Sequence, residues 1–482
     1  MWKKIIAFLI SADMVLSLGA CSGTEPGNDS AGQRIEAGGA VEDNDGMTGE
    51  NNTEWETETG NSQENLTGEE GGLRQLVSEN MEGCLTENGY YYLTTEMEEL
   101  YDGNFGTHLM YMDFAAQQEI YLCSNAGCTH NSQDCPSVFP CDDFPLYTTI
   151  LFVWKDSLYV LSKKSDDDGS SIQFFGERIG DSDYMEERSA VLYKMNLDGT
   201  GRERFYVFDA SLTLEDLVLC DETGLYVVTK KLSAQEEEEG TFINSAERRL
   251  VYLDPESKEI KDICNLEFGD SISWHLADCY GRTLVLEGID YKREVSNEEL
   301  YDDDAYKDIF DNSEEIVATL SIDNGSPVVR YRMSNQALNS SVIDRNMLYV
   351  SSEADGVVRS VDLITGQEKE LYRAQEGACY LYQKIGDKLC CEEKLEGHEF
   401  SYIDVDTGEI CRSSLVNKSL GWRLEFRGVL DSDVLVIYDY EATPLYGESY
   451  EITRYQFGLI SQEDLFAGND NFRRINMIGK GR

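Results

Sequence analysis

The stretch VLYKMNLDGTGRERFYV, Val191–Val207, decides the fold of this chain. Aromatic and aliphatic residues alternate with polar ones on both sides of Asp198-Gly199. An Asp-Gly pair tolerates the positive φ that a tight hairpin turn requires. The stretch therefore predicts two antiparallel strands joined by a short turn.

Hairpins of this kind recur along the chain, and each is preceded or accompanied by a turn residue with a short apolar strand. The seven apolar strands are NGYYYLTT near Tyr91, DSLYVLS from Asp156, TGLYVVT from Thr223, GRTLVLEG from Gly281, RNMLYVSS from Arg345, DKLCCEE from Asp387 and DSDVLVIYD from Asp431. The other six hairpins begin at His108, Leu250, Val317, Val358, Ser401 and Tyr450. Sustained helical periodicity is almost absent, so the pattern indicates an all-β chain.

Each unit supplies about four strands, and seven units over residues 73–482 average about 59 residues each. A single four-stranded sheet cannot bury both of its faces, whereas sheets stacked radially around an axis do so. We therefore expect a seven-bladed β-propeller domain at 73–482. A pair of β-sandwiches is the alternative all-β architecture.

The N-terminus has the pattern of a lipoprotein signal peptide at residues 1–20. Lys3 and Lys4 precede an apolar segment, Ile5–Leu18, that is too short to span a bilayer. The tetrad Leu18-Gly19-Ala20-Cys21 resembles the bacterial lipobox. That resemblance implies that Cys21 carries a lipid, becomes the mature N-terminus and anchors an extracytoplasmic protein to the cell membrane. Ordinary secretory cleavage after Ala20 is the alternative.

The segment after the anchor is strongly acidic. Residues 22–72 hold thirteen acids against the single base Arg34, so residues 21–72 are expected to form a lipidated, disordered acidic linker that is extended by self-repulsion. Residues 73–482 hold 78 acids and 37 bases, a net charge of −41. Such acidity disfavours nucleic acid, whose binding requires cationic side chains against phosphates.

One stretch, YLCSNAGCTHNSQDCP from Tyr121, gathers cysteine and histidine in the pattern C-x4-C-x-H-x4-C. Cys123, Cys128, His130 and Cys135 would supply three thiolates and an imidazole, a complete tetrahedral set for structural zinc. Disulfides Cys123–Cys128 and Cys135–Cys141 explain the same residues, and free thiols remain a third interpretation. Whether they bind zinc or form disulfides, these cysteines would crosslink and stabilise a loop between the first and second blades.

The hairpin LYKMNLDGTGRERF also resembles the LY-x-x-x-x-DGT hairpin of TolB-type propeller repeats. Together with the lipobox, the acidic linker and the Cys/His stretch, it makes the whole chain resemble a group of uncharacterised β-propeller lipoproteins of Firmicutes, mainly clostridia. The resemblance implies a fold and a location, and it implies no activity.

Common catalytic motifs are missing from the sequence: there is no G-x-S-x-G elbow, P-loop, H-E-x-x-H pair or G-x-G-x-x-G junction. His108, His275 and His398 are scattered along the sequence, so a histidine base is unsupported. We therefore expect a monomeric, non-catalytic binding or scaffold module for a protein or glycan. The alternative is a polysaccharide-active hydrolase or lyase, which would place two carboxylates about 5–10 Å apart beside exposed aromatic rings.

Overall fold

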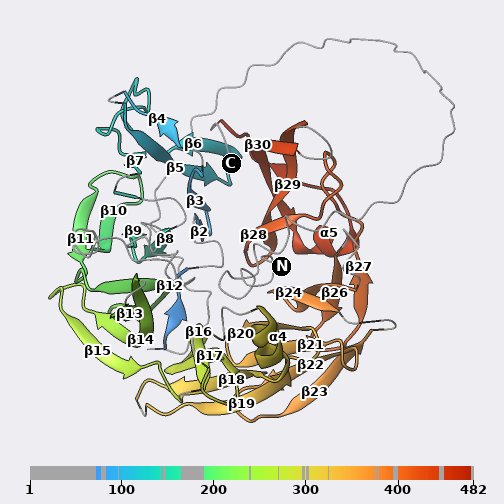
Figure 1. The fold of residues 1–482 in the computed structure, drawn as a ribbon. Helices are drawn as coiled ribbons and strands as arrows, with labels where there is room; N and C mark the ends of the chain where they lie inside the picture. The colour runs from blue at the N-terminus through green and yellow to red at the C-terminus, as the bar shows by residue number, and fades with distance from the viewer. Residues whose placement is uncertain are drawn as a thin grey trace, which may run out of the picture. The chain divides into compact units, whose positions relative to one another are not determined.

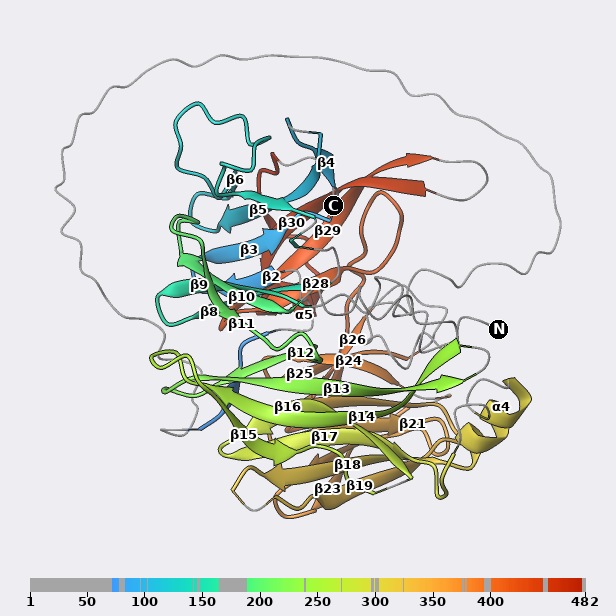
Figure 2. The ribbon, with the colours of Figure 1, turned by 60° about the vertical axis from the view of Figure 1, so that its left-hand side comes forward.

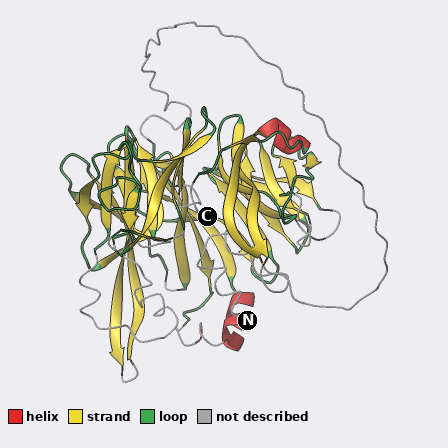
Figure 3. Cartoon of the chain, turned by 90° about the horizontal axis from the view of Figure 1, so that it is seen from above, coloured by secondary structure: helices red, strands yellow, loops and turns green. Residues whose placement is uncertain are grey.

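The protein is described here from a computed structural model. It describes residues 72–478 except 78–82, 96, 102, 142, 145–147, 164–188, 238–239, 270, 296–298, 300–302, 324, 375–376, 378, 394–399 and 445–449. The predicted signal peptide, Cys21 and almost all of the acidic linker lie outside this part of the chain. Figure 3 shows that strands dominate it, with two short helices, α4 (Asp303–Asp311) and α5 (Gln462–Ala467).

Seven antiparallel sheets radiate around a common centre, so the predicted seven-bladed β-propeller is confirmed (Figure 1). Blade 1 comprises β2 (Gly83–Thr86), β3 (Gly89–Leu93), β5 (Phe105–Asp113) and β6 (Gln118–Tyr121), with β4 (Glu98–Glu99) and β7 (Val138–Pro140) also paired to β5. Blade 2 comprises β8 (Thr149–Trp154), β9 (Ser157–Ser162), β10 (Val191–Asn196) and β11 (Glu203–Val207). Blade 3 comprises β12 (Leu212–Cys220), β13 (Leu225–Glu237), β14 (Gly240–Leu253) and β15 (Ile260–Asn265), with β1 (Arg74–Gln75) paired to β12.

The remaining four blades follow the same plan. Blade 4 comprises β16 (Ile272–Tyr280), β17 (Thr283–Asp290), β18 (Glu314–Ser321) and β19 (Val328–Ser334). Blade 5 comprises β20 (Asn339–Asp344), β21 (Met347–Ser352), β22 (Val357–Asp362) and β23 (Glu368–Arg373). Blade 6 comprises β24 (Tyr380–Ile385), β25 (Lys388–Glu392), β26 (Ser401–Asp404) and β27 (Ile410–Arg412). Blade 7 comprises β28 (Glu425–Val429), β29 (Asp433–Pro444), β30 (Tyr450–Ser461) and β31 (Arg473–Arg474).

The hydrophobic core is divided among the seven interfaces between neighbouring blades. Each of seven clusters joins the facing sides of two adjacent sheets, and one of them joins blade 7 to blade 1. Cys390 and Cys391 illustrate the arrangement, because successive strand residues point to opposite faces. Cys390 packs toward blade 7 and Cys391 toward blade 5. Every blade is therefore buried on both faces.

The C-terminal segment closes the ring between blade 7 and blade 1. Beyond β31 the backbone N–H of Asn476 donates to the oxygen of Gln117 at 2.9 Å, and the N–H of Glu119 donates to the oxygen of Asn476 at 3.0 Å. Ile475 is buried in the cluster shared by the two blades. The chain end thus adds to the outer strand of the first blade, which removes an exposed sheet edge.

The seven apolar strands that the sequence singles out are the second strands of the seven blades, β3, β9, β13, β17, β21, β25 and β29. The predicted hairpin at Tyr450 is wrong. Tyr450–Ser461 is one continuous strand, β30, and α5 separates it from β31. Ser461 caps α5, since its side chain accepts a hydrogen bond from the N–H of Asp464, and this cap ends the strand where a turn was expected. The described residues contain no helix long and apolar enough to cross a membrane.

Candidate metal centre

The Cys/His stretch belongs to an extension of blade 1. Strand β5 extends beyond the four-stranded sheet of blade 1. Its first half, Phe105–His108, pairs with β4 and β7, and its second half pairs with β3 and β6. We call residues 97–108 and 122–140 the blade-1 lobe. Figure 2 shows β4 and the loop after β6 at the end of the blade away from β2. The stretch therefore returns to blade 1 through β7, whereas a plain connection between two blades was expected.

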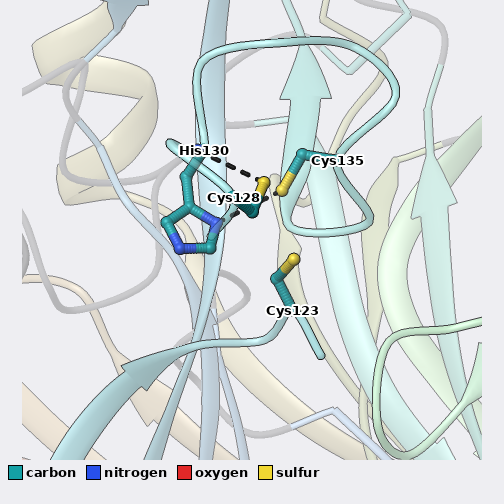
Figure 4. Close-up of side chains that lie close together, drawn as sticks. All are labelled: Cys123, Cys128, His130 and Cys135. Atoms are coloured by element: carbon teal, nitrogen blue, oxygen red, sulfur yellow. Dashed lines mark hydrogen bonds between the residues drawn. The ribbon is translucent and has the colours of Figure 1, made fainter. Parts of the chain in front are cut away.

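The four predicted ligand residues meet in this lobe (Figure 4). One ligand atom from each of Cys123, Cys128, His130 and Cys135 lies within 4.8 Å of all the others. The ring Nδ1 of His130 is 3.4 Å from the Sγ of Cys135, and the backbone N–H of His130 donates to the Sγ of Cys128 at 3.4 Å. Cys141 does not join the group. No disulfide joins Cys123, Cys128 and Cys135 to one another.

The imidazole of His130 is held in place by residues outside the group. Its backbone adopts a left-handed conformation with φ of 54°, which turns the chain back toward the cysteines. The ring stacks on Tyr121 with centroids 4.3 Å apart, and the ring Nε2 of His108 lies 2.6 Å from the carbonyl oxygen of His130. His108 is itself buried on β5. These contacts hold the ring and the backbone of His130 in a position where Nδ1 faces the Sγ of Cys135.

The pKa values of the thiols in the group are shifted in different directions. The hydrogen bond from the backbone N–H of His130 lowers the pKa of the Cys128 thiol. Burial raises the pKa of the Cys135 thiol to about 11, and its Sγ also lies 3.1 Å from the hydroxyl of Ser137. Burial, helped by the nearby His108, lowers the pKa of His130, so the imidazole is neutral at pH 7. A neutral imidazole is the form that binds a metal.

The donor set and its spacing fit a tetrahedral zinc ion. Zinc–sulfur bonds of about 2.3 Å place ligand atoms about 3.8 Å apart along the edges of a tetrahedron. The distance of 3.4 Å between Nδ1 of His130 and Sγ of Cys135 is close to that value, and the group as a whole needs a contraction of at most about 1 Å. Three thiolates and one imidazole would complete the coordination sphere without water.

The lobe has very little apolar packing of its own. Its separate hydrophobic cluster contains only three buried side chains, Leu100, Cys135 and Val138, with Cys123 and Cys128 packed against them. The spacing in the sequence identified the four candidate ligand residues. It missed Tyr121, His108 and Ser137, because the contacts of these residues depend on the return of β7 to β5, which no local pattern announces.

Comparison with known proteins gives fold likeness only. No protein-family model matches the chain, and no curated protein matches it. Among solved structures, a puromycin-hydrolyzing peptidase of Mycobacterium tuberculosis is 13% identical with a TM-score of 0.47, and the match covers 85% of this chain and 55% of that one. An acylaminoacyl peptidase of Pyrococcus horikoshii is 11% identical with a TM-score of 0.38, covering 68% and 46%. The chain thus spans about half the length of these peptidases.

Proposed function

We propose that this chain is a lipid-anchored, extracytoplasmic recognition protein. Its propeller is a non-catalytic platform for a protein or glycan partner, and a structural zinc ion holds the blade-1 lobe. The observation that carries the zinc assignment is the convergence of Cys123, Cys128, His130 and Cys135 within 4.8 Å in a lobe that has almost no core. Small units without sufficient apolar packing commonly depend on a metal or on disulfides.

A structural role for the zinc follows from the number of protein ligands. Catalytic zinc sites keep one coordination position for water or substrate, whereas four protein ligands close the sphere. The side chains around the group are also arranged to hold it, as the stacking of Tyr121 on His130 indicates. The zinc would therefore fix the shape of the lobe and would not take part in a reaction.

The lobe presents apolar side chains to solvent. On the hairpin that it contributes, Met97, Tyr101 and Phe105 are 54%, 89% and 52% exposed. Large exposed apolar side chains near one another are typical of protein-binding surfaces. A rigid lobe bearing Tyr101 at its tip supports a recognition role, since a preorganised surface loses little entropy on binding.

The anchor and its location are supported by the sequence alone. The lipobox-like tetrad ending at Cys21 and the acidic linker would hold the propeller away from the membrane surface. Metabolic labelling with palmitate in a bacterial host tests this part. The wild-type chain should be labelled and membrane-bound, and Cys21→Ala should be unlabelled and released; label that persists in Cys21→Ala would contradict the anchor.

Zinc content and free-thiol counts test the metal site on the full chain, purified anaerobically. We expect one zinc per chain, lost in Cys128→Ser and retained in Cys141→Ser, which removes a nearby thiol outside the group. A chain without zinc that gains free thiols on reduction would carry disulfides in the lobe. That result would refute the zinc assignment.

One observation favours the enzymatic alternative. On blade 4, Glu287 pairs with Val317, so Glu315, two residues before Val317, lies on the same face. Burial and the neighbouring Glu287 raise the pKa of Glu315 to about 7, a value suited to a general acid. Glu287 accepts hydrogen bonds from His275 at 3.0 Å and from Ser341 at 3.3 Å.

The same contacts do not make a nucleophilic triad. The carboxylate of Glu287 stands between His275 and Ser341, whereas a triad needs the histidine next to the hydroxyl. An assay of reducing ends released from neutral and acidic polysaccharides tests the alternative. Turnover that Glu315→Gln abolishes would establish it, and the absence of turnover at pH 5–8 would leave the recognition function.

A further inference from the structure

A cavity of about 610 Å³ lies on blade 7, where the loop between blades 6 and 7 meets the long β29–β30 hairpin. We call it the blade-7 pocket; it is lined by residues drawn from 414–419, 438–441 and 468–474, together with Gln456. Its volume falls within the range of about 300–1,000 Å³ that is usual for small-ligand sites. The residues that line it have no role in the metal centre.

The first wall of the pocket is a well-ordered loop. Asn417 is fully buried, and its side chain donates to the oxygen of Trp422 at 2.9 Å and accepts from the N–H of Leu420 at 2.8 Å. The N–H of Ser419 donates to the carboxylate of Asp439 on β29 at 3.0 Å. These bonds hold the loop against the hairpin, so the wall is formed before any ligand arrives.

The second wall follows α5 and is also held in place. The carboxylate of Asp464 accepts hydrogen bonds from the side chains of Asn469 and Asn471, both at 3.0 Å. Phe472 then stacks on Tyr438 with ring centroids 5.1 Å apart and planes 23° apart. The guanidinium of Arg474 lies 5.3 Å from the centroid of Tyr438. Aromatic surface and a guanidinium group therefore meet on one side of the pocket.

The polar lining has mixed charge. Asp439, Glu441 and Asp470 contribute three carboxylates, and Lys418 and Arg474 contribute two cations. The side chain of Gln456 donates to Glu441 at 2.7 Å. A multiply charged anion would face an excess of carboxylates here, and an apolar ligand would leave these groups without hydrogen bonds. The lining suits a neutral ligand with many hydroxyl groups.

An ion pair between Lys418 and Asp470 joins the two walls at 2.8 Å. The two side chains are 66% and 59% exposed, and exposed pairs of this kind contribute about 0–1 kcal/mol to stability. A ligand can therefore separate the pair at little cost. The ammonium and the carboxylate would then be available as donor and acceptor for ligand hydroxyls.

We propose that the blade-7 pocket binds a short neutral oligosaccharide. The apolar face of a sugar ring would pack on Tyr438 and Phe472, and the sugar hydroxyls would bond to Asp439, Asp470 and Arg474. Carboxylates and guanidinium groups make the stronger, charge-assisted hydrogen bonds. This inference rests on the proposed recognition function and names the chemistry of one partner, and it does not depend on the zinc.

Calorimetric titration of the full chain with neutral tetrasaccharides tests the proposal. The probes are β-1,4-glucan, β-1,4-mannan, α-1,4-glucan and β-1,4-N-acetylglucosamine tetramers, with an α-1,4-galacturonate tetramer as the anionic counterpart. We expect at least one neutral probe to bind. Arg474→Ala should weaken it about tenfold through the loss of a charge-assisted bond, and Tyr438→Ala should abolish binding. Arg373→Ala, which alters an arginine on blade 5 that is also exposed, should leave binding unchanged.

Three results would overturn the proposal: no neutral probe binds a chain whose unfolding is cooperative, only the galacturonate probe binds, or both pocket variants bind as the wild type does. Arg474 is exposed on β31, so its alanine variant keeps the test valid if Tyr438→Ala fails to fold. A chain that binds no glycan but retains a protein partner and its zinc would leave the recognition function standing without this pocket.

Discussion

Loss of the metal should unfold the blade-1 lobe and leave the ring intact. Ordering the thirteen residues Cys123–Cys135 costs about 13–26 kcal/mol at about 1–2 kcal/mol per residue. Burial of the three side chains of the lobe cluster, Leu100, Cys135 and Val138, offsets about 4–7 kcal/mol of this cost. The deficit is close to the apparent binding free energy of structural zinc, about 10–16 kcal/mol. The proposed zinc would therefore supply the stability that the lobe lacks, whereas the seven interfaces between blades have apolar cores of their own.

Hydrogen exchange measured by mass spectrometry separates these two regions. After chelation, or in Cys128→Ser, peptides from 123–135 should exchange as fast as an unstructured peptide, and peptides from blades 3–6 should keep their protection. The Cys141→Ser variant should behave as the wild type, since Cys141 lies outside the group of four. Protection of 123–135 that survives chelation in a fully reduced chain would refute the reasoning.

Three further predictions concern the propeller itself. Arg423→Met should destabilise the fold by about 3–5 kcal/mol in urea unfolding, because it leaves the buried carboxylate of Glu392, 2.5 Å away, unpaired; the exposed Arg412→Met should cost no more than about 1 kcal/mol. Ile475→Ala should cost about 2–5 kcal/mol and lower the melting temperature in calorimetry, because this side chain fills the interface that closes the ring. Burial raises the pKa of Glu315 from 4.5 to about 7, so the folded state binds a proton more tightly than the unfolded state does. The free energy of unfolding should therefore fall as pH rises between these two values. The Glu315→Gln variant should show a smaller loss of melting temperature between pH 5 and pH 8.

The repeat was predictable because its strongest signal is local. An apolar strand after a turn residue can be recognised in a single sequence. All seven such strands are the second strands of blades, where they are buried on both faces. The innermost strands carry a weaker signal. In β20 (Asn339–Asp344) every residue is half-buried, so neither an apolar run nor a clear alternation marks it.

The sequence predicted which residues form the candidate metal centre, and it did not predict which residues surround them. Spacing identified Cys123, Cys128, His130 and Cys135, since a ligand set is a local pattern. The support of His130 by Tyr121 and His108 depends on pairing between β5 and β7, which lie about thirty residues apart and are joined by the lobe itself. The blade-7 pocket left no sequence signal, because its lining comes from four separate parts of the chain.

The candidate metal centre and the blade-7 pocket both lie near the closure of the ring, and Tyr121, which stacks on His130, also packs against the cluster that joins blade 7 to blade 1. The closure has other contacts that do not involve the four candidate ligands. The C-terminal segment leaves the pocket at Arg474 and binds Gln118 and Glu119 of β6. Glu119 is fully buried and accepts hydrogen bonds from Tyr92 of β3 and from the backbone of Ile478. These bonds are made by residues of β3 and β6, which lie outside the two segments of the lobe. Because the closure is secured by the blade and its interface with blade 7, an oligosaccharide bound in the pocket should keep its affinity when the zinc is removed.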